Sequence, residues 1–305
     1  MPSRRLGRSL GVNNVPFKTC TYSCIYCQLG RTTRLTLRRE GFHDPMELAR
    51  EVEEALASGV EVDYVTVVPD GEPTLDSGLG KLVELLKSMG ARVAVLTNAS
   101  LLWREDVRQD LEPSDLVSLK LDSVVESSWV TVNRPHPELS LEEVLAGVQE
   151  FAESFKGRLL VESMLIDGVN DSLEELRSLA EFIPGLRPFK AYVAVPTRPP
   201  AEPWVRPSGG EALVTAYELV KSKLGEGRVE LLASPEGLEV GVVGDPVDAV
   251  ARTCSVHPLR LEQALNMLAG RVEEPEGALR GLIDAGVVEA VNYRGEVFLV
   301  RRPRT

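Results

Sequence analysis

The sequence predicts an α/β fold, a partial (β/α)6 TIM-like barrel followed by a small C-terminal winged-helix-like domain. Three observations lead to this prediction. Short, nearly continuous apolar runs alternate with amphipathic segments six times, which is typical of a parallel sheet covered by helices. A polar loop follows each apolar run. The pattern changes after about residue 233, and we place the boundary between domains 1–235 and 236–305.

The barrel prediction rests on six strand-then-helix units. The predicted strands are Leu10–Phe17, Asp63–Val68, Arg92–Leu96, Leu116–Leu121, Arg158–Ile166 and Phe189–Val195. The helices that follow them cover residues 45–58, 79–89, 101–111, a long region ending near 156, 173–183 and 211–224. The first helix has the clearest signals, with Asp44 as its cap, Pro45 at its first position and Gly59 after its end. In such a sheet the chemistry belongs on loops at the carboxyl ends of the strands.

The C-terminal segment predicts three short helices, at 246–254, 259–268 and 276–286, and then a hairpin that turns at Arg294 and Gly295. This order suggests a winged helix. Around its third helix, the presumed recognition helix, four acidic residues stand against the single basic residue Arg280, and that face would repel phosphates. The acids are Glu273, Glu274, Glu276 and Asp284. The basic residues of the wing are Arg294, Arg301, Arg302 and Arg304. Nucleic-acid binding, protein docking and a simple packing role therefore all remain open.

The charge of the chain is uneven. The formal net charge is −12, yet the first 39 residues contain eight Lys and Arg residues and no acid. We expect a locally positive field that attracts an anionic substrate or an acidic partner; basic residues solvating a flexible N-terminus are the alternative. No apolar run reaches the roughly 18 residues of a membrane span, and the N-terminus lacks the apolar core of a signal peptide. We expect a cytoplasmic protein without a membrane partner.

Three of the four cysteines form a CxxxCxxC array within KTCTYSCIYCQLG, residues 18–30. They are Cys20, Cys24 and Cys27. Clustered thiolates repel one another unless a metal neutralises them, so the array predicts a metal site. A structural zinc site is the alternative, but the next histidine, His43, lies outside the usual zinc spacing. The fourth cysteine, Cys254, is expected to be a small buried hydrophobe.

The array resembles the cysteine motif of the radical S-adenosylmethionine (radical SAM) superfamily, with an aromatic residue, Tyr26, before the third cysteine. The resemblance includes Gly71-Glu72-Pro73 after the next strand and covers roughly residues 5–235. The segments GEPTL, SLKLD, NRPHP and TRPP are similar to those of stand-alone iron–sulfur oxidoreductases of that superfamily. This closer likeness brings no substrate with it.

The resemblance implies two cofactors. The three cysteines would bind a 4Fe–4S cluster and leave one iron without a protein ligand, where S-adenosylmethionine binds. One electron from an external donor would then cleave S-adenosylmethionine to a 5′-deoxyadenosyl radical that removes hydrogen from the substrate. Gly71, Glu72 and Pro73 match the loop that holds the amino group of S-adenosylmethionine. This chain has Asp70 where many members have a first glycine.

Further candidates lie on the other strand ends. Strand alternation places Lys120 and Asp122 on one face, and they are the predicted catalytic pair. Lys120 binds either the ligand carboxylate or Asp122 itself. Tyr26, Thr97, Asn98 and Ser163 are predicted cofactor contacts; Asn98 would contact the ribose or cap a helix, and Tyr26 would stack on adenine or pack in its loop. The predicted substrate-side residues are Asn133, Arg134, His136 and Arg198; His136 is alternatively a histidine of a surface turn.

Together these features predict a radical SAM enzyme that acts on a macromolecular substrate, either a protein or peptide or an RNA. An iron–sulfur winged-helix regulator that binds nucleic acid without this chemistry is the alternative. Polar loops at all six strand ends disfavour the regulator, because a redox sensor needs no built cavity.

Overall fold

The computed structural model describes residues 2–3, 5–68, 70–233, 237, 240–242 and 244–301. Within these residues, an eight-stranded sheet has the order β1-β2-β5-β6-β7-β8-β9-β10. All neighbouring strands are parallel except the pair β1 and β2. The strands are β1 (Pro2–Ser3), β2 (Gly7–Val12), β5 (Tyr64–Val67), β6 (Val93–Thr97), β7 (Leu116–Lys120), β8 (Arg158–Met164), β9 (Lys190–Ala194) and β10 (Val229–Leu232).

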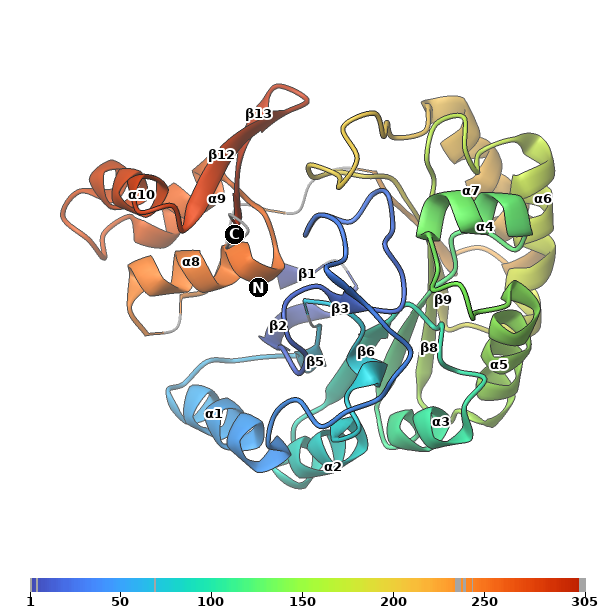
Figure 1. The fold of residues 1–305 in the computed structure, drawn as a ribbon, viewed down its shortest axis with the longest axis horizontal. Helices are drawn as coiled ribbons and strands as arrows, with labels where there is room; N and C mark the ends of the chain where they lie inside the picture. Colours follow the sequence, from blue (N-terminus) through green and yellow to red (C-terminus); the bar gives the residue numbers. More distant parts are fainter. Residues whose placement is uncertain are drawn as a thin grey trace.

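Helices cover the outer face of this open sheet in an arc (Figure 1). They are α1 (Pro45–Ala57), α2 (Leu79–Ser88), α3 (Glu105–Leu111), α4 (Glu126–Asn133), α5 (Leu141–Ser154), α6 (Leu173–Phe182) and α7 (Gly210–Leu224). The main apolar core lies between strands and helices. A smaller apolar cluster, which includes Tyr64, Leu116, Leu160 and Tyr192, fills the inner face.

The predicted partial barrel is confirmed, with three differences in its elements. β2 begins at Gly7 rather than Leu10 and ends at Val12, which leaves a longer loop before the cysteines. β10 adds a seventh parallel strand that we did not predict. The long fourth helical region is two helices, α4 and α5, separated by the NRPHP segment.

The C-terminal unit, residues 240–242 and 244–301, has its own apolar core, in which Cys254 is fully buried as expected. Its elements are α8 (Pro246–Val256), β11 (Leu259–Arg260), α9 (Leu261–Leu268), α10 (Pro275–Asp284), β12 (Val288–Tyr293) and β13 (Glu296–Arg301). Three helices and a hairpin are thus present in the predicted order, and a small sheet forms in the order β11-β13-β12. The winged-helix interpretation stays a prediction. The predicted boundary at 235/236 lies outside the described residues, as do Arg302 and Arg304.

The C-terminal unit lies beside the open side of the barrel (Figure 1). No helix in the described residues has the length and apolarity to cross a bilayer.

Candidate active site

The three clustered cysteines lie on the loop that leaves β2. Cys20 belongs to a short strand, β3 (Thr19–Cys20), paired with β4 (Arg34–Leu35). All three thiols are free and half-buried, and all three line one cavity of about 1810 Å³. The same cavity is lined by Glu72, Asn98 and Lys120 and extends to the C-terminal unit.

Each of the three sulfur atoms has a side-chain nitrogen donor. Lys18 Nζ lies 3.1 Å from Cys27 Sγ, Asn98 Nδ2 lies 3.5 Å from Cys20 Sγ, and Asn133 Nδ2 lies 3.5 Å from Cys24 Sγ. The donors come from the cysteine loop, the end of β6 and the end of α4. Donors around every sulfur are the surroundings that thiolate ligands of a metal require.

Burial disfavours the thiolate form of two of the three thiols, Cys20 and Cys24. Burial raises the pKa of Cys20 to about 12, and the nearby Glu72 carboxylate adds to the rise. Burial, followed by the charge of Asp122, raises the pKa of Cys24 above its usual range. A metal must therefore displace these protons when it binds. In the described part of the chain, no three His, Cys, Asp or Glu side chains are placed to hold a single metal ion.

Position 71 has no room for a side chain, because the backbone of the cysteine loop lies directly against it. A Cβ atom on Gly71 would lie 1.8 Å from the carbonyl oxygen of Thr19. The next residue, Glu72, donates its backbone N–H to that same oxygen over 3.0 Å. Glycine therefore lets the second strand-end loop pack directly on the residue that precedes Cys20.

The carboxylate of Glu72 is 1% exposed and is held by donors from two loops. Its Oε1 accepts from Thr74 Oγ1 and Thr97 Oγ1, both at 2.6 Å, and its Oε2 accepts from the N–H of Asn98 at 2.8 Å. Burial raises the pKa of Glu72, and the bonds from Thr74 and Thr97 oppose the rise. Glu72 thus presents a fixed carboxylate to the cavity. Pro73 begins the 3₁₀ turn that follows.

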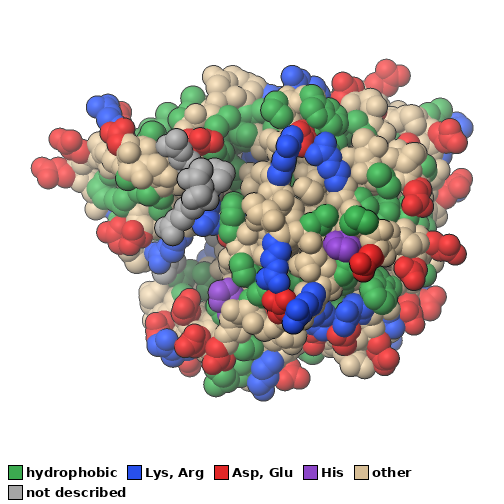
Figure 2. All heavy atoms as spheres, in the orientation of Figure 1, with side chains coloured by type: hydrophobic (Ala, Val, Ile, Leu, Met, Phe, Trp, Pro, Cys, Tyr) green, Lys and Arg blue, Asp and Glu red, His purple; other side chains and the backbone are tan. Residues whose placement is uncertain are grey.

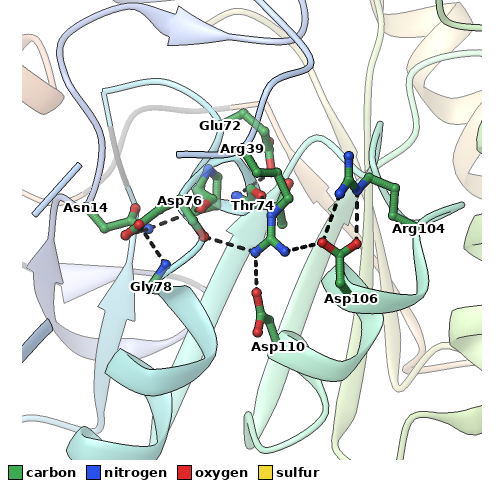
Figure 3. Close-up of polar contacts among 10 residues, drawn as sticks. Asn14, Arg39, Glu72, Thr74, Asp76, Gly78, Arg104, Asp106 and Asp110 are labelled. Atoms are coloured by element: carbon green, nitrogen blue, oxygen red, sulfur yellow. Dashed lines mark hydrogen bonds and ion pairs between the residues drawn. The ribbon is translucent and has the colours of Figure 1, made fainter. Parts of the chain in front are cut away.

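A polar network fixes this turn from below (Figure 3). Arg39 Nε donates to the carbonyl of Thr74 over 2.8 Å, and its guanidinium pairs with Asp106 and Asp110. Asn14 Nδ2 donates to Asp76 over 3.1 Å. The Glu72 loop is therefore tied both to α3 and to the loop after β2.

Asn98 has more partners than the sequence indicates. Its Nδ2 donates to Thr21 Oγ1 over 2.7 Å and contacts Cys20. Its Oδ1 accepts from the N–H of Ser100. Thr97 contributes its hydroxyl to Glu72. Both residues therefore position the cysteine loop and Glu72, and a direct cofactor contact by either stays a prediction.

The predicted pair Lys120 and Asp122 has a third member that we did not predict. Lys120 Nζ lies 2.7 Å from Glu162 Oε1 on the neighbouring strand and 3.9 Å from Asp122. Arg5 contacts the other oxygen of Glu162. Burial lowers the pKa of Lys120, while the charge of Asp122 opposes the shift. Lys120 and Glu162 both line the cavity.

Asp122 is fully buried and its oxygens are occupied. It accepts from the hydroxyl of Tyr26, from Asn133 Nδ2 at 2.7 Å and from the N–H of Met164 at 2.9 Å. Asp122 therefore joins the cysteine loop to α4 and β8, and its catalytic role stays a prediction. Tyr26 lines the cavity, with Lys120 Nζ 5.0 Å from its ring centre, and its predicted stacking on adenine stays a prediction.

Ser163 does not take the position expected of a cofactor contact. Its hydroxyl is buried without a hydrogen-bond partner in the structure, and Ser163 is not among the residues that line the cavity. Strand alternation instead directs its neighbour Glu162 inward.

The predicted substrate-side loops also have structural partners. In NRPHP, the backbone of Asn133 and His136 bonds to the cysteine loop. His136 does not line the cavity and accepts from the N–H of Glu138, as expected of a turn histidine. Arg134 pairs with Glu202. Arg198 does line the cavity, and its Nη2 lies 2.5 Å from His257 Nε2 of the C-terminal unit.

The arginine side chains that the structure describes in the N-terminal segment have acidic partners, and the positive field that we expect there stays a prediction. Apart from Arg4, which the structure does not describe, each of its arginines pairs with an acid. The pairs are Arg5–Glu162, Arg8–Glu61, Arg31–Glu202, Arg34–Glu40, Arg38–Glu40 and Arg39–Asp110. The pairs of Arg5 with Glu162 and of Arg31 with Glu202 connect the segment to distant parts of the chain; the alternative of a solvating end stays untested.

Asp70 links the site to the C-terminal unit. Its carboxylate, 5% exposed, lies 3.4 Å from Arg301 Nη1, and the Arg301 guanidinium lies 4.1 Å from the ring centre of Phe17. Burial raises the pKa of Asp70 to about 6, although Arg301 and Lys18 oppose the rise. Asp70 Oδ1 is buried without a hydrogen-bond partner in the structure.

Comparison with known proteins explains this arrangement. The family model of the radical SAM superfamily matches residues 14–183. The chain belongs to the radical SAM superfamily. It is therefore an enzyme of a family that uses a 4Fe–4S cluster and S-adenosylmethionine. The cysteines, each free and supplied with a donor, fit the cluster.

This radical SAM chain is similar in sequence to the following two proteins. A UPF0026 protein of Methanocaldococcus jannaschii is 37% identical over 303 residues, which cover 99% of this chain and 94% of the relative. A probable dual-specificity RNA methyltransferase, RlmN, of Gloeobacter violaceus is 25% identical over 218 residues, covering 67% of this chain and 59% of the relative.

Solved structures share the fold. A radical SAM methyltransferase from Sphaerobacter thermophilus has a TM-score of 0.58 and 18% identity, over 75% of this chain and 66% of that one. Streptococcus suis SuiB bound to its precursor peptide SuiA has a TM-score of 0.55 and 16% identity, over 76% of this chain. The match spans about half the length of SuiB, 50% of that chain.

Proposed function

We propose that this radical SAM enzyme cleaves S-adenosylmethionine reductively and abstracts hydrogen from a macromolecular substrate, which we infer to be an RNA. The observation that carries the proposal is the single cavity. It begins at the three cysteines, passes Glu72 and Lys120, and ends at side chains of the C-terminal unit. At about 1810 Å³ it exceeds the roughly 300–1,000 Å³ of common ligand sites. A cofactor and part of a substrate can therefore share it.

The chain's own residues would hold the cofactors as follows. Cys20, Cys24 and Cys27 bind the cluster through their thiolates. Glu72, fixed by its donors, accepts from the amino group of S-adenosylmethionine, with Gly71 bringing the two loops together. When bound, the cluster and S-adenosylmethionine supply the one-electron cleavage and the hydrogen-abstracting group. The electron comes from an external one-electron donor.

Lys120 is the proposed partner for an anionic group that enters the inner face of the barrel. Its ammonium shares Glu162 with Arg5 and lies 3.9 Å from Asp122. Asp122, bound to Tyr26 and Asn133, holds the cysteine loop against the strand that carries Lys120. These residues orient groups and exclude water from the cavity.

The C-terminal unit contributes basic side chains to one wall of the cavity, which we call the basic wall. Its charged or titratable residues that line the cavity are Arg252, His257, Arg271 and Arg301. None of the acidic side chains in the described part of this unit lines the cavity; acidic side chains appear on its outer side (Figure 2). Arginines in a cleft suit phosphate groups because the guanidinium matches phosphate geometry.

This basic wall supports RNA over a peptide. The RNA-modifying relative is similar in sequence, whereas the peptide-bound structure supports the fold alone. In this proposal the C-terminal unit is a winged-helix-like domain that binds substrate through its inward face, rather than through the acidic α10. The alternative of a regulator without S-adenosylmethionine chemistry is not supported, because the chain belongs to an enzyme superfamily.

Anaerobic reconstitution tests the proposal. The wild type, reduced with dithionite in the presence of S-adenosylmethionine, should form 5′-deoxyadenosine. Cys24→Ala should lose the cluster and the product, while Cys254→Ala, a thiol of the separate C-terminal core, should retain the cluster. A wild-type protein with an intact cluster and no 5′-deoxyadenosine would contradict the proposal.

A further inference from the structure

Lys18 is a buried lysine whose ammonium is directed at a cluster ligand. It is 3% exposed, and its Nζ lies 3.1 Å from Cys27 Sγ. Its backbone is fixed on both sides, because its N–H donates to the carbonyl of Asp70 over 2.8 Å and its own carbonyl accepts from Thr33 and Arg34. A φ of 56° places it in the left-handed region. The side chain is thus held at the thiol by the fold of the loop.

The contact differs from those at the other two thiols. Asn98 and Asn133 are neutral amides 3.5 Å from their sulfur atoms. Of these three side-chain donors, Lys18 makes the shortest contact with its sulfur atom and bears a formal positive charge. Charge-assisted hydrogen bonds are roughly twice as strong as neutral ones, and burial protects this charge from screening by salt.

We infer that Lys18 raises the reduction potential of the cluster that Cys27 helps to bind. Reduction adds one negative charge to the cluster and its thiolates. A cation bonded to a ligand sulfur stabilises the reduced form more than the oxidised form. Lys18 therefore makes the cluster easier to reduce by a low-potential one-electron donor, and acts as a positioning residue rather than a catalytic one.

Asp70 provides a second test of this inference, because its negative charge opposes the positive charge of Lys18. The backbone carbonyl of Asp70 accepts from the N–H of Lys18, and its carboxylate is buried. Burial raises the pKa of Asp70, and the charges of Arg301 and Lys18 oppose the rise. Without this negative charge, the positive charge of Lys18 should raise the reduction potential of the cluster further. Asp70→Asn should therefore shift the potential upward.

Redox titration of the reconstituted full-length protein, followed by the electron paramagnetic resonance signal of the reduced cluster, tests the inference. At a fixed solution potential, Lys18→Met should lower the ratio of reduced to oxidised cluster by about tenfold, a shift of about 59 mV for one electron. Lys18→Arg keeps the charge and should stay near the wild type. Lys81→Met, on an exposed face of α2, is the matched control.

Two results would overturn the inference. One is a Lys18→Met potential equal to that of Lys81→Met at the same iron content, and the other is a Lys18→Arg shift as large as that of Lys18→Met. If Lys18→Met binds too little iron, Asp70→Asn decides, because an unchanged or lower potential contradicts the inference. The inference rests on the proposed cluster ligation, which iron content tests separately and without any turnover.

Discussion

The polar side chains on the two walls of the cavity differ in how far they are buried. On the barrel wall, Glu72 and Glu162 are buried and each is bonded to at least two donors. On the wall of the C-terminal unit, Arg252, Asn266 and Arg271 are exposed. A satisfied buried network fixes groups in place at little reorganisation cost, whereas exposed arginines adapt to a flexible polyanion. The barrel wall is thus suited to a cofactor of constant shape, and the other wall to a substrate.

The largest effect is expected where the barrel wall is tightest. Gly71→Ala would drive a Cβ into the Thr19 backbone at 1.8 Å, and a backbone atom cannot rotate away. We expect a loss of about 3 kcal/mol or more of unfolding free energy, measured by urea denaturation, together with reduced iron binding. Gly41→Ala is the control, because its new Cβ would lie 3.8 Å from the nearest atom. Equal stabilities of the two variants would show that the loops do not pack as described.

Loss of the fixed carboxylate should weaken cofactor binding. Glu72→Gln keeps the shape of the side chain but removes its charge, and its amide would face the hydroxyls of Thr74 and Thr97 and the N–H of Asn98. We expect about 30-fold weaker S-adenosylmethionine binding, or about 2 kcal/mol, by equilibrium dialysis. Glu61→Gln, at the exposed rim, should bind normally. Normal binding by Glu72→Gln would remove Glu72 from the cofactor site.

Asp70 should make stability depend on pH. Its pKa of about 6 in the folded protein exceeds the unfolded value of about 3.9, so the folded state binds more protons between these values. The unfolding free energy should therefore fall as pH rises from about 4 to about 6. Asp70→Asn should remove this part of the fall and be more stable above pH 6 by on the order of 2 kcal/mol. Denaturation at several pH values, with the exposed Asp167→Asn as control, checks it; identical profiles for both variants would contradict it.

The smallest effect is expected on the wall that the C-terminal unit contributes to the cavity. The double variant Arg252→Ala and Arg271→Ala should bind RNA about tenfold more weakly and lower the dependence of affinity on salt by about one unit of slope per lost phosphate contact. Fluorescence anisotropy with a labelled RNA measures both. Arg280→Ala, on the acidic α10, is the matched control. Equal RNA affinities of the double variant and of Arg280→Ala would contradict RNA binding at this wall.

The parts that could be predicted from the sequence are those whose signals are local. Alternating strands and helices, the cysteine spacing and the Gly71-Glu72 pair each lie within a few residues. β10 was missed because no helix in the predicted strand-then-helix rhythm follows it. Ser163 was predicted inward because the strand register, which decides the inward face, is not visible in the sequence.

Contacts between distant segments explain the rest. Glu162 meets Lys120 across neighbouring strands, and Arg301 reaches Asp70 from the other end of the chain. The N-terminal arginines appear as a positive segment in the sequence, yet their acidic partners extend as far as Glu202. The basic wall comes from separate helices and strands, so no local count of charge could predict it. Lys18 could have been found, since it lies two residues before the first cysteine.

The most direct test of the central claim compares substrates in one cavity. The reduced, cluster-loaded enzyme with S-adenosylmethionine would be incubated with a small-RNA fraction or a peptide fraction from the source cells, and 5′-deoxyadenosine measured. The account predicts that RNA raises the yield above that of the enzyme alone and that peptides do not. Stimulation by the peptide fraction alone would contradict it.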